Sequence, residues 1–246
     1  FSAYSKNNIT CIFPHFSNPQ LILKRYNGVE TYVVDSIYTN KEGKFILNYS
    51  DDAYGMGYLV SEYEKPFIVV LSGEDIVLKG ETFSKPETIQ IIKGKENQLF
   101  ARYATEHPRR EQALSAWIYL EKIYSQDSLF AVQAVPGQAI AKEKQRIKAE
   151  DRLSLAGLSL ETYVSWYLPL RKLVSSVPTV AQYRTEEIPA TIAAFRKLNY
   201  TDPRLHKSGL LADVIESHFW LIENSGRSLD SVYIEMNVSI DYLIDN

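Results

Sequence analysis

The sequence contains a single cysteine among its 246 residues, and this scarcity excludes several kinds of site. Cys11 alone can form neither an internal disulfide nor a Cys-x-x-Cys redox pair, and it cannot supply a cysteine-rich zinc site. The four histidines, His15, His107, His206 and His218, are scattered along the chain. His206 and His218 are about 120° apart on a helix, so we do not expect them on one face. The sequence therefore predicts no metal site and no cofactor.

Long apolar runs and an excess of positive charge are also absent. The longest strongly apolar stretch, Phe67–Leu71, is far shorter than the ~18 residues of a transmembrane helix. The chain has 27 Lys and Arg residues against 30 Asp and Glu residues, for a net charge of −3. Neither residues 1–95 nor the remainder has the basic excess that binding to a phosphate backbone requires. We therefore do not expect a nucleic acid partner.

The densest basic run is interleaved with acidic residues. Its members are Arg146, Lys148 and Arg152, which alternate with Glu143, Glu150 and Asp151. Opposite charges that alternate along a helix are typical of a face in water. We interpret the run as a solvated helix face.

Residues 1–95 show the pattern of short strands separated by turns. Phe45, Leu47 and Tyr49 recur at every second position, which is the period of a half-buried strand. The dipeptide Asn27-Gly28 is typical of a hairpin turn. Strands are expected at about 21–26, 30–38, 45–49, 56–62, 67–71, 76–79 and 88–93. This spacing predicts a domain at 1–95 that is an antiparallel β-sandwich or barrel of about seven strands.

From residue 96 the period becomes helical. Ala113, Trp117, Leu120 and Tyr124 fall on one stripe, and Pro108 is expected in the first turn of that helix. Further helices are expected from Pro136 to about Leu155, from Thr162 to Val174 with Pro178 as the boundary, from Pro189, from the N-cap Asp202 through Ile222, and from Ser228 to the end. The sequence thus predicts an all-helical domain at 96–246 and an α+β fold class.

The residues that could carry acid–base chemistry have simpler structural explanations. Asp51-Asp52 is expected in a turn, and Glu186-Glu187 is expected to cap a helix start, where carboxylates complement the dipole. His218 lies on an apolar stripe, which favours a core position. Gly55-Met-Gly57 lacks the third glycine of a dinucleotide fingerprint and is typical of a bulge or tight turn. No Gly-x-Ser-x-Gly motif is present, so we predict that the chain is not an enzyme.

Trp166, Tyr167 and Arg171 form the one candidate interaction surface. Aromatic rings beside a cation can bind a sugar or a peptide, because their faces offer contact area at low entropic cost. The alternative is a packed seam between helices. Both explanations remain open at the level of sequence.

Several segments resemble one known family. The stretch VDSIYTNKEGKFIL from Val34 resembles a hairpin in the N-terminal domains of Bacteroides-type envelope thiol–disulfide oxidoreductases. The helical half is similar in YVSWYLP from Tyr163, RTEEIPATIAAF from Arg184 and KSGLLADVIESHFW from Lys207. Together these motifs span most of the chain.

The resemblance implies a context and no catalytic residue. Family members carry a leader or lipid-attachment signal, a small β-domain, a helical region and a C-terminal thioredoxin-like domain with the Cys-x-x-Cys pair. This chain has no second cysteine, so it resembles the region before that domain, and the protein is expected to continue past Asn246 into it.

The implied role is a non-catalytic accessory region in the cell envelope, for client recognition, positioning or dimerisation. Its expected partners are the thioredoxin-like domain and protein clients, with a membrane tether through a removed leader and a homodimer as further expectations. The alternative is a stand-alone envelope module that binds a glycan or a peptide.

Overall fold

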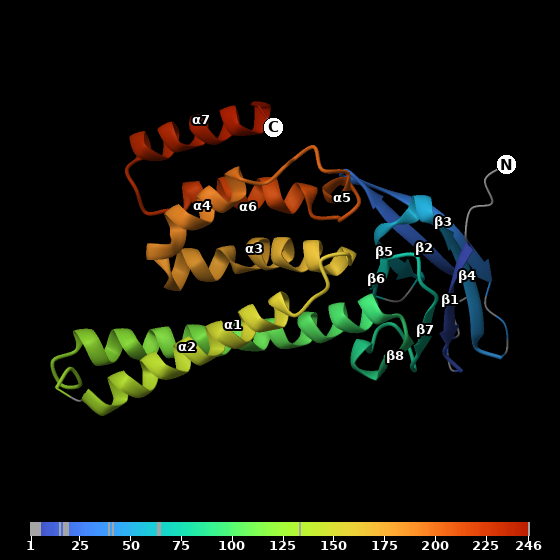
Figure 1. The fold of residues 1–246 in the computed structure, drawn as a ribbon, viewed down its shortest axis with the longest axis horizontal. Helices are drawn as coiled ribbons and strands as arrows, with labels where there is room; N and C mark the ends of the chain where they lie inside the picture. Colours follow the sequence, from blue (N-terminus) through green and yellow to red (C-terminus); the bar gives the residue numbers. More distant parts are fainter. Residues whose placement is uncertain are drawn as a thin grey trace. The chain divides into compact units, whose positions relative to one another are not determined.

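The structure is a computed structural model that describes residues 6–14, 16, 20–38, 40, 42–62, 65–132 and 134–245; His15 lies outside them. Within these residues the fold is mixed α+β, with eight strands in two sheets followed by seven α-helices (Figure 1). The predicted α+β class is confirmed.

The two sheets have four strands each. The first has the order β4-β1-β7-β8, and the second has the order β3-β2-β5-β6. The strands of the first sheet are β1 (Lys6–Ile12), β4 (Lys44–Ser50), β7 (Ile76–Lys79) and β8 (Gln90–Lys93). Those of the second are β2 (Gln20–Asn27), β3 (Glu30–Tyr38), β5 (Gly55–Val60) and β6 (Phe67–Leu71).

Strand β1 corrects the sequence prediction in two ways. It was not among the expected strands, since its sequence KNNITCI contains two asparagines, which are depleted in strands. It also pairs in parallel with β7, with Ile9 opposite Ile76 and Cys11 opposite Leu78. A fully antiparallel arrangement is therefore wrong at this pair. Periodicity in the sequence shows where strands lie along the chain. It does not show which strands become neighbours, because that depends on the path of the chain between them.

One apolar core holds side chains from both sheets. Every second residue of β1 and β4 is buried, as the predicted alternation requires for β4. The core draws on these residues of the first sheet: Ile9, Cys11, Phe45, Leu47, Ile76 and Leu78. It also contains Leu21, Leu23, Leu59, Val69 and Leu71 of the second sheet.

The helices follow residue 94. They are α1 (Lys95–Gln126), α2 (Ala134–Ala156), α3 (Tyr163–Tyr183), α4 (Ile188–Arg196), α5 (Pro203–His206), α6 (Leu211–Glu223) and α7 (Leu229–Asp245). Three 3-10 turns accompany them: η1 (Asp51–Ala53), η2 (Pro86–Thr88) and η3 (Thr185–Glu187). None of the helices within the described residues is long and apolar enough to cross a membrane.

Two predicted helix boundaries at proline are wrong. Pro108 lies inside α1 and Pro178 lies inside α3. A proline inside a helix costs about 3 kcal/mol, because it removes a backbone hydrogen bond and clashes with the preceding turn. Here buried side chains occur on both sides of each proline, Tyr103 and Leu114 around the first and Val177 and Val180 around the second. Their burial offsets that cost, so each helix continues.

Two other helix predictions have mixed outcomes. Asp202 is an N-cap as predicted, since its side chain accepts a hydrogen bond from the backbone of Arg204. It opens only the short α5, because Gly209 has a φ of 72° and the chain starts a new helix at Leu211. In α1 the buried residues of the apolar cluster are Leu114 and Ile118, and the predicted Ala113 and Trp117 pack against them partly buried. The predicted Leu120 is exposed.

The chain forms two compact units that are interleaved in sequence. The first consists of Phe1–Ala101, Glu161–Val164 and Thr201–Ala212, and the second contains the rest. The predicted domain 1–95 lies within the first unit. Two later segments return to that unit from the region predicted to be all helical.

The returning segment 201–212 is joined by backbone hydrogen bonds to the strands of the first unit, which we call the sheet unit. Gly28 donates to the carbonyl of His206 at 2.7 Å, and Met56 donates to the carbonyl of Lys207 at 2.8 Å. Gly55 has a φ of 139°, and a Cβ on it would lie 2.7 Å from Lys207. The predicted bulge or tight turn is wrong here, because residues 55–57 lie in β5, which pairs with β2 and β6 without a register shift. Gly55 instead lets a distant segment approach β5 closely.

Replacing Gly55 by Ala is expected to lower the free energy of unfolding by about 1–2 kcal/mol, since Ala is strained at this φ and collides with Lys207. Urea denaturation of the full chain measures the change. Gly137→Ala in α2 is the matched control, because nothing lies within 4 Å of a Cβ there and Ala favours a helix. Equal stability of the two variants contradicts the assignment.

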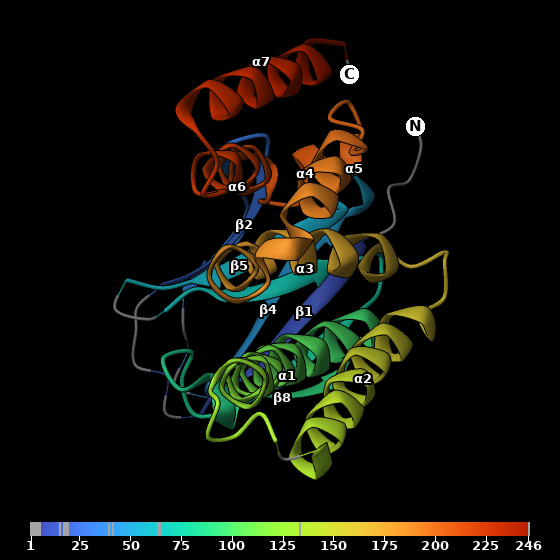
Figure 2. The same ribbon diagram turned by 90° about the vertical axis from the view of Figure 1, so that its left-hand side faces the viewer.

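Within the second unit α1 and α2 run side by side as a long pair (Figures 1 and 2). Leu114 and Ile118 of α1 pack with Ile147 of α2, and Trp117 and Tyr183 pack against them. This small apolar cluster adjoins the charged residues described next.

Candidate functional site

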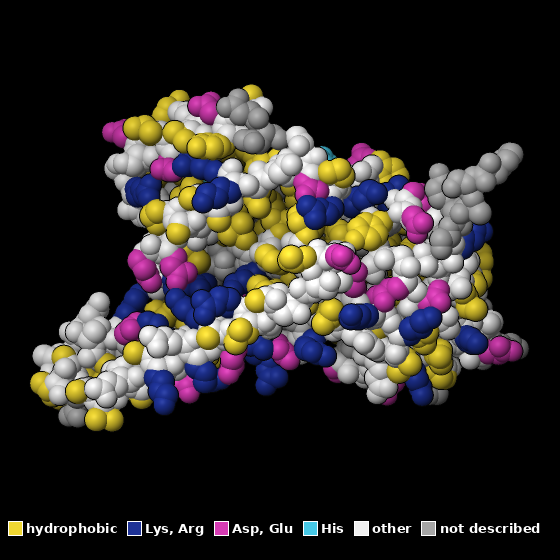
Figure 3. All heavy atoms as spheres, viewed as in Figure 1, with side chains coloured by type: hydrophobic (Ala, Val, Ile, Leu, Met, Phe, Trp, Pro, Cys, Tyr) yellow, Lys and Arg dark blue, Asp and Glu magenta, His cyan; other side chains and the backbone are white. Residues whose placement is uncertain are grey.

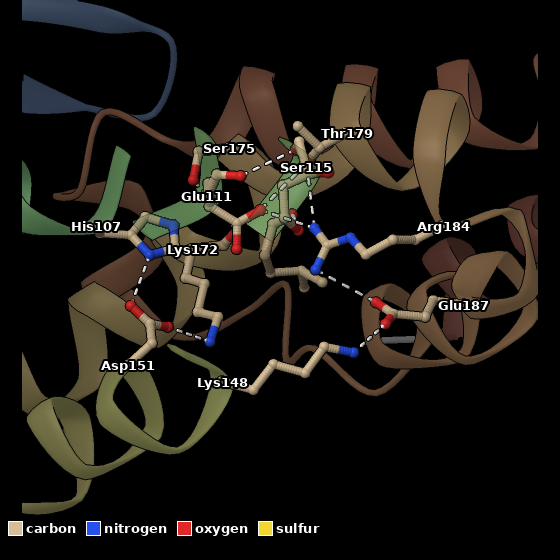
Figure 4. Close-up of polar contacts among 12 residues, drawn as sticks. His107, Glu111, Ser115, Lys148, Asp151, Lys172, Ser175, Thr179, Arg184 and Glu187 are labelled. Atoms are coloured by element: carbon tan, nitrogen blue, oxygen red, sulfur yellow. Dashed lines mark hydrogen bonds and ion pairs between the residues drawn. The ribbon is translucent and has the colours of Figure 1, made fainter. Parts of the chain in front are cut away.

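Charged side chains gather inside the second unit, where α1, α2, α3 and η3 approach one another (Figure 4). We call them the polar cluster. Its members are His107 and Glu111 from α1, Lys148 and Asp151 from α2, Lys172 and Thr179 from α3, and Arg184 and Glu187 at η3.

Asp151 is the centre of the first half of the polar cluster. Asp151 is 4% exposed, and His107 beside it is 5% exposed. Nδ1 of His107 lies 2.8 Å from Oδ1 of Asp151, and Lys172 donates to Oδ2. Arg110 places Nη1 3.8 Å from Oδ1. A buried carboxylate therefore has a basic group on each side.

These partners keep Asp151 ionised. Burial by itself raises the pKa of the carboxyl, but the hydrogen bonds from His107 and Lys172 and the charge of Lys172 outweigh it. The result is a pKa of about 2, below the ordinary value. Asp151 is thus a permanent negative charge at neutral pH rather than a proton donor.

Arg184 is the centre of the second half. It donates to Oε2 of Glu111 at 2.8 Å and to Oγ1 of Thr179 at 3.1 Å, and it lies 3.5 Å from Glu187. Glu187 also accepts a hydrogen bond from Lys148 at 3.0 Å. The Lys148 side chain is 49% exposed, so this last ion pair is held weakly.

A pocket of about 370 Å³ opens beside the polar cluster. Its wall consists of Arg110, Glu111, Leu114, Ile147, Lys148, Asp151, Arg152, Leu155, Lys172 and Glu187. His107 is not part of this wall, and its Nε2 is buried without a hydrogen-bond partner among the described residues. The pocket therefore presents fixed charges to a ligand rather than an imidazole positioned to move a proton.

The sequence contained a signal for Asp151 that the charge pattern concealed. The buried residues of α2 are Ile140, Ile147 and Asp151, whose spacings of seven and four place them on one face. The prediction of a solvated face is correct for Arg146, which pairs with Glu143 and Glu150 at the surface. It is wrong for Asp151, which lies on the apolar stripe.

The candidate surface at Trp166, Tyr167 and Arg171 lies on α3. Tyr167 is 3% exposed, and Trp166 and Arg171 are partly buried. Burial raises the pKa of the Tyr167 hydroxyl, while the charge of Arg171 and a hydrogen bond from it lower it. The Tyr167 ring consequently offers no open face to a sugar, although the site itself stays a prediction.

His218 occupies the core position that its apolar stripe predicted. It is fully buried, its ring is stacked on Phe195 with centroids 5.2 Å apart, and Nε2 lies 3.1 Å from Oγ of Ser239. Burial and then the charge of Arg196 lower its pKa to about 4. His218 is therefore neutral at pH 7 and links α6 to α7.

The two acidic pairs have different outcomes. Asp51 and Asp52 form η1, where Ser50 donates to the Asp52 carboxylate, so the predicted turn is confirmed. Glu187 precedes α4, but its side chain makes no capping hydrogen bond. Its predicted place at the start of a helix is confirmed, since it is the N-cap residue of α4, but its carboxylate pairs with Lys148 and Arg184 instead of capping the backbone.

Cys11 is fully buried in β1, and burial raises the pKa of its thiol to about 12. The thiolate is the reactive form, so this sulfur is inert at neutral pH in the folded chain. Among the described residues no group of three or more His, Cys, Asp and Glu side chains is arranged to hold a metal ion.

Comparison with protein-family models, with curated proteins and with solved structures finds no match to this chain.

Proposed function

We propose that this chain is a non-catalytic accessory region of an envelope thiol–disulfide oxidoreductase, and that it positions the thioredoxin-like domain of that protein through its last helix. In this proposal the two sheets form a β-sandwich around their shared core, and the envelope location and the membrane tether follow the resemblance. The inert thiol of Cys11 supports a role outside the redox chemistry.

The exposed apolar face of α7 is the observation that carries the proposal. Leu229, Tyr233, Ile240 and Ile244 are 86%, 69%, 43% and 76% exposed. Their spacings of four, seven and four residues place them on one stripe of the helix. A continuous apolar stripe in water is typical of a surface that binds another protein.

The opposite side of α7 is fixed within the second unit, so the stripe is presented on a rigid support. Arg196 binds Glu235 through its carboxylate and its carbonyl, and it donates to Oγ of Ser239 at 2.9 Å. Arg227 adds an ion pair to Glu235 at 3.0 Å. Val232 and Ser239 are buried on this side.

The family resemblance indicates which protein domain binds the apolar stripe of α7. In that family the thioredoxin-like domain follows the helical region, so α7 is the element of this region nearest to it in sequence. Binding of client proteins and pairing of two copies are competing uses of the same stripe, and the experiment below separates them.

The test uses two purified proteins, the chain and the thioredoxin-like domain that the proposal expects to follow it. Calorimetry is expected to show binding, and Tyr233→Asp is expected to weaken it about tenfold, because it places a charge in an apolar contact. Ile234→Asp is the matched control, since Ile234 is equally exposed (65%) but lies about 100° around the helix.

Three outcomes contradict the proposal. They are equal binding by the two variants, a homodimer that Tyr233→Asp disrupts while the thioredoxin-like domain does not bind, and reduction of insulin disulfides by the chain alone at the rate of a thioredoxin.

A further inference from the structure

The pocket beside the polar cluster has one uncompensated positive charge. Four cations line it, Arg110, Lys148, Arg152 and Lys172, against the carboxylates of Glu111, Asp151 and Glu187. Glu106 and Arg184, which pair with members of this wall, add one charge of each sign. Counting Lys, Arg, Asp and Glu, the wall and its partners have an excess of one cation.

Arg152 is the cation left over. Its side chain is exposed and forms no ion pair or hydrogen bond with the side chains that the structure describes. It stands four residues after Lys148, so both side chains project from the same face of α2. They also line a smaller adjoining hollow with Gln145 and Ala149.

A second donor points to the same ligand. Nη1 of Arg110 is buried and has no hydrogen-bond partner among the described residues, and it lies 3.8 Å from Oδ1 of Asp151. A buried N–H without an acceptor is costly, so a shift of the Arg110 side chain that lets this nitrogen pair with an acceptor bound in the pocket is favourable. In Figure 3 Lys and Arg side chains gather between α2 and α3 on this side of the second unit.

The rest of the wall is apolar. Leu114, Ile147 and Leu155 complete the pocket, and its volume of about 370 Å³ is that of a site for a small molecule. A dianion such as inorganic phosphate gains nothing from these apolar side chains and carries more charge than the single excess cation balances. A carboxylate with a hydrocarbon group matches both the single excess charge and the apolar wall.

We propose that this pocket binds a small organic monocarboxylate, with its carboxylate between Arg152, Lys148 and Arg110 and its hydrocarbon group against Leu114, Ile147 and Leu155. The proposal is independent of the role of α7. A ligand of this size is expected to bind with a Kd on the order of 1 mM.

The experiment is a titration of the isotope-labelled full chain with hexanoate, followed by the amide resonances of α1, α2 and α3. Hexanol tests the requirement for charge, and inorganic phosphate tests the requirement for an apolar group. Hexanoate is expected to shift the amides around the pocket, with hexanol and phosphate each at least tenfold weaker.

Two variants of α2 locate the carboxylate. Arg152→Gln is expected to weaken hexanoate binding about tenfold, which is the usual loss for a charge-assisted hydrogen bond. Arg146→Gln removes an equal charge from the exposed side of the same helix and is expected to leave the affinity unchanged. Equal loss in both variants, binding of phosphate as tight as that of hexanoate, or no shift of the pocket amides at 50 mM hexanoate (about fifty times the expected Kd) overturns the proposal.

Discussion

Replacing Asp151 by Asn is expected to lower the free energy of unfolding of the full chain by about 3 kcal/mol. The substitution keeps the shape of the side chain and removes its charge. His107 then faces an amide, and Lys172 and Arg110 lose the carboxylate that they approach. Breaking a buried ion pair from one side is costly because the remaining charges stay partly out of water.

Urea denaturation followed by circular dichroism measures this loss. Glu150→Gln is the matched control, because Glu150 is the neighbouring acid on the exposed face of α2 and pairs only with Arg146 among the described residues. It is expected to change stability by less than about 0.5 kcal/mol. A loss of that small size in Asp151→Asn means that the polar cluster does not hold the helices together.

Lowering the pH from 6.5 to 4 is expected to remove about 3 kcal/mol of stability through His218. Its pKa in the folded chain is about 4, below the value of about 6.5 in an unfolded chain. Between these values the unfolded chain binds a proton that the folded chain refuses, so stability is complete above pH 6.5 and falls as the pH falls. Urea denaturation at intervals across this range measures the slope.

Two variants test whether the His218 imidazole causes this dependence of stability on pH. His218→Gln is expected to flatten it, since an amide does not titrate here. Ser239→Ala is the control, because it removes the contact to Nε2 and leaves the imidazole buried, which is the main cause of the lowered pKa. A wild-type slope in His218→Gln contradicts the assignment, whatever the absolute stability of the variant.

The sequence predicted the elements of this fold better than their partners. The alternation in β4 and the helices expected from Pro189 and from Ser228 rest on local patterns, and the structure has β4, α4 and α7 close to the expected bounds. The parallel pairing of β1 with β7 is not a local property, because it depends on which strand the chain brings back to β1. The helix boundaries predicted at Pro108 and Pro178 are wrong for a similar reason. Each helix continues through its proline because tertiary packing buries side chains on both sides of it.

The polar cluster shows the same limit at the level of side chains. Asp151 lies among charged neighbours in sequence, and composition alone describes that stretch as solvated. The spacing from Ile140 and Ile147 places it on the buried stripe, yet its partner His107 is 44 residues away and belongs to another helix. A periodicity can show that an acid is buried, whereas the base that stabilises it is known only once the helices are placed.

The return of residues 201–212 to the sheet unit also determines the order in which that unit is completed during synthesis. Strands β2 and β5 leave the ribosome early, but the carbonyls of His206 and Lys207 that accept hydrogen bonds from Gly28 and Met56 emerge about 150 residues after Met56. Until then those donors lack the acceptors that they have in the folded chain. The sheet unit is therefore finished only after most of the helices have been translated, and a chain cut short at residue 101 lacks part of its structure.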